Sequence, residues 1–282
     1  MFKGWGTFIL IICSLAFSDP RGVGAVDDLK LNIEANPGFA LSYMENPAAV
    51  AFTDPSIYFS RIERTDWQWQ TNRLNICLPG KNWSAAVDVR YDALDNLPNT
   101  IQNNDGRFET SSTFSQEKTA ALVSLAGTLI SGLWVGTNLK AYSLKIADQT
   151  VQGTGVDVGV LWKPLTNLFL GWSRADVGDT QQMASTGKVD VQLASDLFSV
   201  TWRDLDASVS YLASVDQPHL VRGQFHLLDG VWLAATTPIN NPQNVSLQLD
   251  LKLDPLTIRY TTSFSELNSR QSQLTLGWSL GD

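Results

Sequence analysis

The sequence predicts an all-β protein: a single closed, antiparallel, transmembrane β-barrel of about fourteen strands. Three observations predict this fold. Apolar and polar residues alternate along most of the chain, short and long connections alternate between the strands, and the chain begins with an export-type leader. Averages alone would suggest a mildly acidic soluble protein, since the net charge is −8 and the mean hydropathy is −0.06. These averages conceal the barrel because each strand combines an apolar face with a polar one.

The first element is a predicted signal peptide, residues 1–25, which is cleaved during export. Lys3 supplies its positive end, residues 5–17 its apolar stretch, and Val23-Gly24-Ala25 a small-residue cleavage site. The alternative, an N-terminal anchor helix, requires a longer apolar stretch. Cys13 lies in this leader, so export leaves Cys77 without a partner for an internal disulfide. We interpret Cys77 as a small strand residue in preference to a nucleophile.

Residues 26–56 show no strand pattern, whereas residues 57–282 are predicted to form the barrel. In the barrel region Val245, Leu247 and Leu249 alternate with polar residues, as expected where side chains point to opposite faces of a strand. The same pattern predicts strands at residues 57–63, 67–78, 83–92, 117–128, 133–145, 155–163, 168–175, 197–203, 207–213, 220–228, 231–237, 244–253, 256–265 and 271–280.

The connections alternate in length along the chain. After even-numbered strands they are short and rich in turn-forming residues: 79–82, 129–132, 164–167, 204–206, 229–230 and 254–255. After odd-numbered strands they are longer: 93–116, 146–154, 176–196, 214–219, 238–243 and 266–270; only the first link, residues 64–66, departs from this trend. Short turns at one end and long loops at the other are typical of outer-membrane barrels. Residues 188–194 also alternate, and we interpret them as an ordered part of a long loop or an extension of the eighth strand.

Tryptophans gather near the predicted strand ends, which indicates an aromatic belt at the membrane interface. The alternative is that they cap the core of a soluble sandwich. The predicted belt comprises Trp67, Trp83, Trp134, Trp162, Trp172, Trp202, Trp232 and Trp278.

Charged residues on the polar strand faces are the candidates for lining the lumen. Their mixed signs predict mutual pairing, because a charge removed from water needs a partner. They could line a gated path or ligand pocket, or they could simply fill the lumen. The candidates are Asp88, Arg90, Lys140, Asp157, Arg203, Arg222, His226, Asp250, Lys252 and Arg259.

The sequence indicates neither catalysis nor a cofactor. His226 lies one predicted strand away from Ser208 and Ser210, but polar residues of these kinds are expected in any water-filled lumen. Asp204 and Asp206 fit a tight turn better than a calcium site, and no metal-ligand spacing is present. Acidic residues outnumber basic ones, 28 to 20, so no nucleic-acid partner is expected. No apolar run outside the leader has the length of a membrane-spanning helix.

Several segments resemble the FadL-like superfamily of outer-membrane barrels, including its PorV/PorQ-type group. Asn46-Pro47-Ala48-Ala49 matches the Asn-Pro-Ala-(Gly/Ala) turn that precedes the first barrel strand in that superfamily. Residues 135–142, the Gly-rich stretch 155–164 and residues 168–172 resemble its middle strands. The sequence departs from the pattern in having only Gly38 upstream of the turn and in ending on Leu280-Gly281-Asp282 without a terminal aromatic residue.

The resemblance implies a fold, a location and two possible functions. It implies that residues 26–56 form a short, plug-like N-terminal segment tucked into the lumen, with residues 46–49 as its turn. The barrel would then lie in the outer membrane of a diderm bacterium, surrounded by lipid. The first function is passage of a hydrophobic or otherwise small molecule. The alternative is a non-transporting scaffold that binds a secretion-machine protein through its long loops. A soluble exported β protein is a third possibility. No enzymatic activity is expected.

Overall fold

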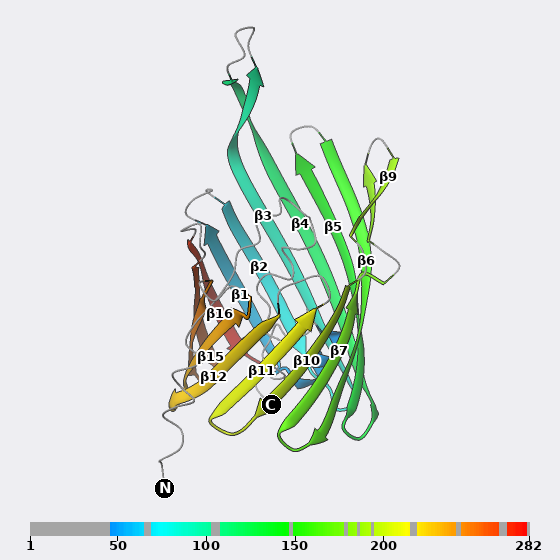
Figure 1. Ribbon diagram of the computed structural model, residues 1–282, viewed down its shortest axis with the longest axis vertical. Coiled ribbons are helices and arrows are strands. Elements are labelled where there is room, and N and C mark those ends of the chain that lie inside the picture. Colours follow the sequence, from blue (N-terminus) through cyan, green and yellow to red (C-terminus); the bar gives the residue numbers. More distant parts are fainter. Residues whose placement is uncertain are drawn as a thin grey trace.

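Antiparallel pairing between successive strands closes the chain into a barrel (Figure 1). The computed structural model describes residues 46–64, 69–102, 108–146, 149–177, 180–184, 187–192, 195–214, 219–240, 244–264 and 270–280. The elements are the 3-10 helix η2 (Pro47–Phe52) and the strands β1 (Ser56–Arg64), β2 (Trp69–Leu78), β3 (Trp83–Gln102), β4 (Phe108–Ile130), β5 (Leu133–Ile146), β6 (Gln149–Leu165), β7 (Leu168–Ala175), β8 (Thr180–Ala184), β9 (Gly187–Gln192), β10 (Ser195–Arg203), β11 (Ala207–Ser214), β12 (Leu220–Leu228), β13 (Val231–Pro238), β14 (Ser246–Leu253), β15 (Leu256–Phe264) and β16 (Arg270–Ser279).

The wall of the barrel consists of fourteen strands, which confirms the predicted fold class. β1 pairs with β2 on one side and with β16 on the other, so the first and last strands are neighbours. The remaining two strands, β8 and β9, extend the hairpin formed by β7 and β10. β8 resumes pairing with β6 beyond the end of β7, and β9 pairs with β8. Residues 188–192 therefore belong to an ordered extension of the eighth wall strand.

Strand directions and connections sort into two ends, here called the turn side and the loop side. Links of two residues join β12 to β13 and β14 to β15 on the turn side. On the loop side β3 and β4 run far beyond the other strands as one tall hairpin (Figure 1). The prediction of a loop over residues 93–116 was therefore wrong for most of its length, as was that for 146–154, where β6 already begins at Gln149. Alternation could not reveal these extensions, because a strand that is polar on both faces has no period of two.

The polarity of the wall is the reverse of that of a soluble protein. In β3 the side chains of Val87 and Val89 are 41% and 42% exposed on the outside, whereas Asp88 between them is 1% exposed on the inside. Backbone groups of the wall pair with adjacent strands, so closure leaves no unpaired edge in an apolar surrounding. Among the described residues no helix is long and apolar enough to cross a membrane.

Candidate functional site: the lumen and its N-terminal segment

The segment Asn46–Pro55 lies inside the barrel and leads directly into β1. Its core is η2, which contacts β3, β4, β5 and β6 and so covers one part of the inner wall. Pro47 and Ala48 are completely or almost completely buried there. The matched turn 46–49 thus occupies the lumen. Residues 26–45 of the predicted plug-like segment and the predicted signal peptide lie outside the described residues.

Asn46 joins the segment to two strands of the wall. Its side-chain Nδ2 donates to the main-chain oxygens of Val160 in β6, at 3.0 Å, and Trp172 in β7, at 3.3 Å. Its Oδ1 accepts from the backbone N–H of Ala48 at 3.1 Å and so caps η2. A side-chain amide can do both because it carries donors and an acceptor on one planar group.

The wall has glycine where η2 approaches most closely. A Cβ atom on Gly136 would lie 2.5 Å from the backbone N of Ala48 and the carbonyl carbon of Pro47. A Cβ on Gly159 would collide with the Asn46 side chain. Both positions therefore require glycine for the segment to dock as it does.

Two apolar clusters hold η2 against the wall. Val50 packs in one of them with Cys77, Ala86 and Leu122. Ala48 packs in the other with Leu161 and Phe169, next to Phe52 and Trp134. Phe52 makes edge-to-face contacts with Trp134, at a centroid distance of 4.5 Å, and with Phe169, at 5.6 Å. These clusters give the lumen an apolar area beneath the segment.

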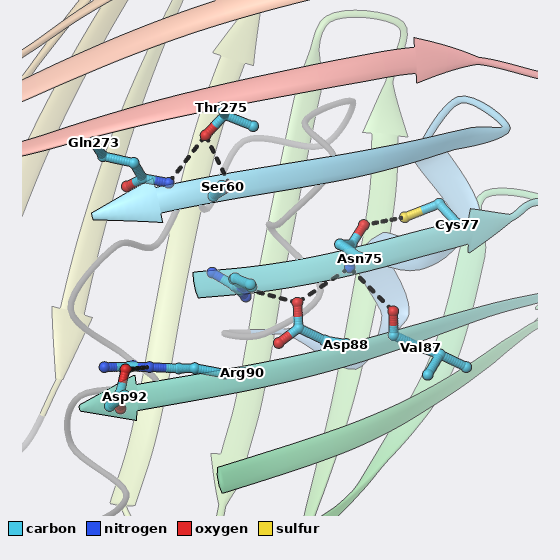
Figure 2. A network of polar contacts seen from close by, with 10 residues as sticks. Ser60, Asn75, Cys77, Val87, Asp88, Arg90, Asp92, Gln273 and Thr275 are labelled. Carbon is cyan, nitrogen blue, oxygen red and sulfur yellow. Dashed lines mark hydrogen bonds and ion pairs between the residues drawn. The ribbon is translucent and has the colours of Figure 1, made fainter. Parts of the chain in front are cut away.

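The first buried charge network lies on β2 and β3 (Figure 2). Arg73 Nε donates to Asp88 Oδ2 at 2.6 Å, and Asn75 Nδ2 approaches the same oxygen at 3.4 Å. Figure 2 shows Asn75 between Asp88 and Cys77, whose thiol donates to Asn75 Oδ1. Arg90 Nε pairs with Asp92 Oδ1 at 2.8 Å on the same strand. Asp88 and Arg90 thus line the lumen in two separate ion pairs.

The second network joins β5, β6 and the end of β7. Lys140 Nζ lies 2.7 Å from Asp157 Oδ1 and 2.5 Å from Asp176 Oδ1. Asp157 also accepts from the Asn138 side chain and from the backbone N–H of Asp176. Asp176 has φ 53°, and it is the one non-glycine residue with positive φ within the described ranges. This conformation, which Asp tolerates better than most residues, turns its carboxylate into the lumen where β7 ends.

The third network spans β12, β14 and β15. Arg259 binds Asp250 in bidentate fashion, with Nε and Nη2 donating to the two carboxylate oxygens at 2.8 and 3.0 Å. Gln248 Nε2 donates to the same carboxylate, and Arg222 Nη2 donates to Gln248 Oε1 at 3.3 Å. Bidentate pairing of this kind is among the strongest side-chain contacts. It satisfies a charge that is removed from bulk water.

The buried charges nearly balance. In the described part of the chain the buried cations are Arg73, Arg90, Lys118, Lys140, Arg222 and Arg259, and the buried anions are Asp88, Asp92, Asp157, Asp176 and Asp250. The described part of the lumen therefore lacks the excess of one sign with which charged rings select ions.

Three predicted lumen residues lie near the turn-side opening. Arg203 and Lys252 occupy the ends of β10 and β14 and are exposed. His226 is partly buried, lies 3.5 Å from Asp206 through Nδ1, and stacks on Trp232 at a centroid distance of 4.6 Å. No group of three or more His, Cys, Asp or Glu side chains suited to a metal ion occurs within the described residues.

The predicted tryptophan belt divides into two groups. Trp83, Trp162, Trp202 and Trp278 point outward near the turn-side strand ends, all exposed. Trp172 also lies on the outer face, where its Nε1 donates to Asp196 at 3.1 Å. Trp134 and Trp232 depart from the prediction: Trp134 packs on Phe52 inside the barrel, and Trp232 shares the face of His226 and Asp250. Trp67 lies outside the described residues.

Sequence reasoning missed several residues of the site. Trp134 and Gly136 stand four and two positions before Asn138 along β5, and the period of two alone places them on its inward face. No comparable sequence pattern identified Phe52 or Asp176, because neither residue lies within a strand of alternating apolar and polar residues.

A closed fourteen-stranded barrel with reversed polarity and an N-terminal segment docked in its lumen is the class of structure that these observations define. The sequence matches no protein-family model, and no curated protein matches it. Solved structures do share the fold.

The CymD monoaromatic hydrocarbon channel aligns with a TM-score of 0.59 at 10% identity, covering 93% of this chain and 98% of its own. The toluene transporter TodX of Pseudomonas putida gives 0.54 at 10% identity, covering 84% and 91%. A FadL homologue of Pseudomonas aeruginosa gives 0.50 at 11% identity, covering 87% and 95%. At these identities the comparison establishes a FadL-type barrel fold.

Proposed function

We propose that this protein is an outer-membrane channel of a diderm bacterium that passes small hydrophobic molecules across the membrane, without enzymatic activity. In this proposal residues 1–25 direct export and are removed, and the barrel spans the bilayer with its apolar outer face in contact with lipid. The long loops then face the exterior, as in other outer-membrane barrels.

The reversed polarity of the wall supports membrane insertion. Its outward strand faces carry exposed Leu, Val, Phe and Tyr side chains, and four tryptophans ring the turn side. Amphipathic rings of this kind favour the interface between lipid and water. A soluble protein exposing so much apolar surface would aggregate.

The observation that carries the transport proposal is the apolar area beneath η2. Elsewhere the described inner wall is largely polar or charged, whereas Leu122, Leu161 and Phe169 form apolar surface where Val50 and Phe52 dock. A hydrophobic molecule that displaces η2 would find this surface available. We therefore propose that movement of residues 46–52 opens a path for the molecule, which leaves through the lumen or through an opening in the wall.

The compared channels supply the substrate class. TodX is described as a toluene transporter and CymD as a monoaromatic hydrocarbon channel. We extend this class to the present chain as small, apolar, ring-containing molecules. The near balance between buried cationic and anionic side chains agrees with transport of an uncharged molecule.

The β3–β4 hairpin favours a second candidate function, that of a scaffold for a secretion machine in the manner of the PorV/PorQ-type group. This hairpin rises well above the other strands on the loop side (Figure 1). A protein partner could bind there without entering the lumen.

Two measurements test the proposed function. Membrane fractionation followed by gel migration with and without boiling should place the protein in the outer membrane as a heat-modifiable barrel. Recovery from the soluble periplasm without a migration shift would end the membrane proposal.

Uptake of labelled toluene should then be faster in vesicles with a lipopolysaccharide outer leaflet that contain the protein than in empty ones. This leaflet is needed because its charged sugar layer is the barrier to apolar solutes. Equal rates, together with co-purification of a secretion subunit, would favour the scaffold.

A further inference from the structure

The ring of Phe52 lies between two other aromatic residues of the lumen. Trp134 of β5 and Phe169 of β7 both meet it edge to face, at interplanar angles of 67° and 89°. Aromatic rings favour this arrangement because the positive edge of one ring faces the negative face of another. Leu161 and Ala48, both buried, belong to the same cluster.

We infer that Trp134, Phe169 and Leu161 form a binding site for a single-ring aromatic molecule, and that Phe52 occupies this site as a built-in substitute for the ligand. The inference rests on the proposed function and identifies the site at which its substrate would bind. The site has room for one phenyl ring, because the phenyl ring of Phe52 occupies it in this structure. Its edge-to-face neighbours favour an aromatic ring over a saturated ring of similar size.

Phe52 belongs to η2, which can move out of the lumen while the strands of the barrel wall stay folded. Phe52 is the last residue of η2, and the segment's polar contacts to the wall include the two hydrogen bonds of Asn46. When η2 undocks, Phe52 leaves with it and the aromatic site becomes vacant. An incoming ring and the docked segment therefore exclude each other.

This competition predicts how affinity should change when Phe52 is shortened. In the wild-type protein a ligand binds only the fraction of molecules with η2 undocked, so its apparent affinity is reduced by that fraction. In Phe52→Ala the place of the phenyl ring is vacant even with η2 docked, and cavities lined by Leu and Phe side chains are known to bind benzene. We expect binding at least about tenfold tighter in Phe52→Ala than in the wild type.

The test is 19F NMR of fluorobenzene titrated into the purified barrel in detergent, with protein-free detergent as the blank. Phe52→Ala should show saturable binding to fluorobenzene and much weaker binding to fluorocyclohexane. Phe59→Ala removes a phenyl ring from the lipid-facing side of β1, where Phe59 is 47% exposed, and should behave as the wild type. Adding Trp134→Leu to Phe52→Ala removes one wall and should weaken binding again.

Heat-modifiable migration verifies that each variant is folded, and Phe52→Val serves as a second opening of the site if Phe52→Ala does not fold. A folded Phe52→Ala or Phe52→Val barrel without saturable binding, or with equal binding of both fluorinated rings, would overturn the inference. Toluene uptake is measured separately on the wild type. If the wild type takes up toluene but the variant does not bind fluorobenzene, the proposed transport function is retained and the binding site is rejected. If the variant binds fluorobenzene but the wild type takes up no toluene, the binding site is retained and the transport function is rejected.

Discussion

At the residue scale, docking of the luminal segment depends on one amide and on glycines in the wall. Asn46 bonds to backbone oxygens of β6 and β7, and Gly136 leaves room for the backbone of Ala48. Cys77 reports on this docking, because its thiol is buried in the cluster that contains Val50. Its reaction with a maleimide should be slow while η2 is in place.

Replacing Asn46 with Ala should loosen the segment. The change removes two hydrogen bonds to the wall and the cap of η2, worth about 1–3 kcal/mol of docking free energy in total. Maleimide labelling of Cys77 should then accelerate by about tenfold or more. Asn46→Asp, which keeps the cap acceptor but loses the donor, should also accelerate labelling. Unchanged rates in both variants would show that Asn46 does not hold the segment.

Gly136→Val should displace the segment by steric conflict. Its Cβ would lie too close to the Pro47–Ala48 backbone for η2 to dock unchanged. The barrel should remain heat-modifiable while Cys77 labels faster. The control is Ala121→Val, which adds the same side chain to the outer face of neighbouring β4 and should leave the labelling rate as in the wild type.

Asp250→Asn should destabilise the barrel strongly. It leaves the Arg259 guanidinium buried without its carboxylate, and removal of one partner of a buried ion pair costs about 3–5 kcal/mol. Unfolding free energies in urea would measure this loss. Glu63→Gln breaks the exposed Arg61–Glu63 pair and should cost about 0–1 kcal/mol. Equal losses in the two variants would contradict the buried, paired state of Asp250.

The sequence could predict the residues whose position follows from strand alternation. Asp88, Lys140 and Asp250 were placed in the lumen because they occupy the polar phase of clear strands, and they are buried there. Proximity to a strand end was a weaker guide, since Trp83, the first residue of β3, points outward, whereas Trp134, the second residue of β5, packs inside. The contacts of Phe52 depend on the path of η2 through the lumen, which no local pattern specifies.

At the scale of elements, the β3–β4 hairpin is the feature that differs most from expectation. Its pairing continues from Trp83↔Gly127 to Gln102↔Phe108, with two register shifts on the way. The wall strands around it were predictable because one face meets an apolar surrounding. Above that level the apolar–polar alternation ends, while the pairing of the two backbones continues.

Replacing residues 95–115 with a two-residue Asn-Gly turn should leave the barrel intact. The Asp92↔Lys118 pair and the wall below it are retained, so heat modifiability and toluene uptake should stay close to wild type. If the scaffold function holds, co-purification of its partner should be lost. A variant that fails to fold would show instead that the hairpin is needed to form the wall.

At the scale of the whole molecule, the polar inner wall and the docked segment are consistent with the closed state of the channel that we propose. Among the described residues, Arg73, Arg90, Lys140 and Arg259 pair with buried carboxylates, apolar side chains cover the outside of the wall, and an apolar area of the lumen lies under η2. Opening therefore has a defined cost, that of undocking one short segment. The rest of the barrel need not change.

The proposal that residues 46–52 gate the channel is tested most directly by cross-linking this segment to the wall and measuring transport. Val50→Cys introduces a thiol in the same cluster as Cys77, and a short bifunctional methanethiosulfonate can join the two. We expect toluene uptake by lipopolysaccharide-containing vesicles to fall to the rate of empty vesicles after cross-linking and to recover on reduction. Uptake that continues unchanged in fully cross-linked protein would contradict the claim that residues 46–52 gate the channel.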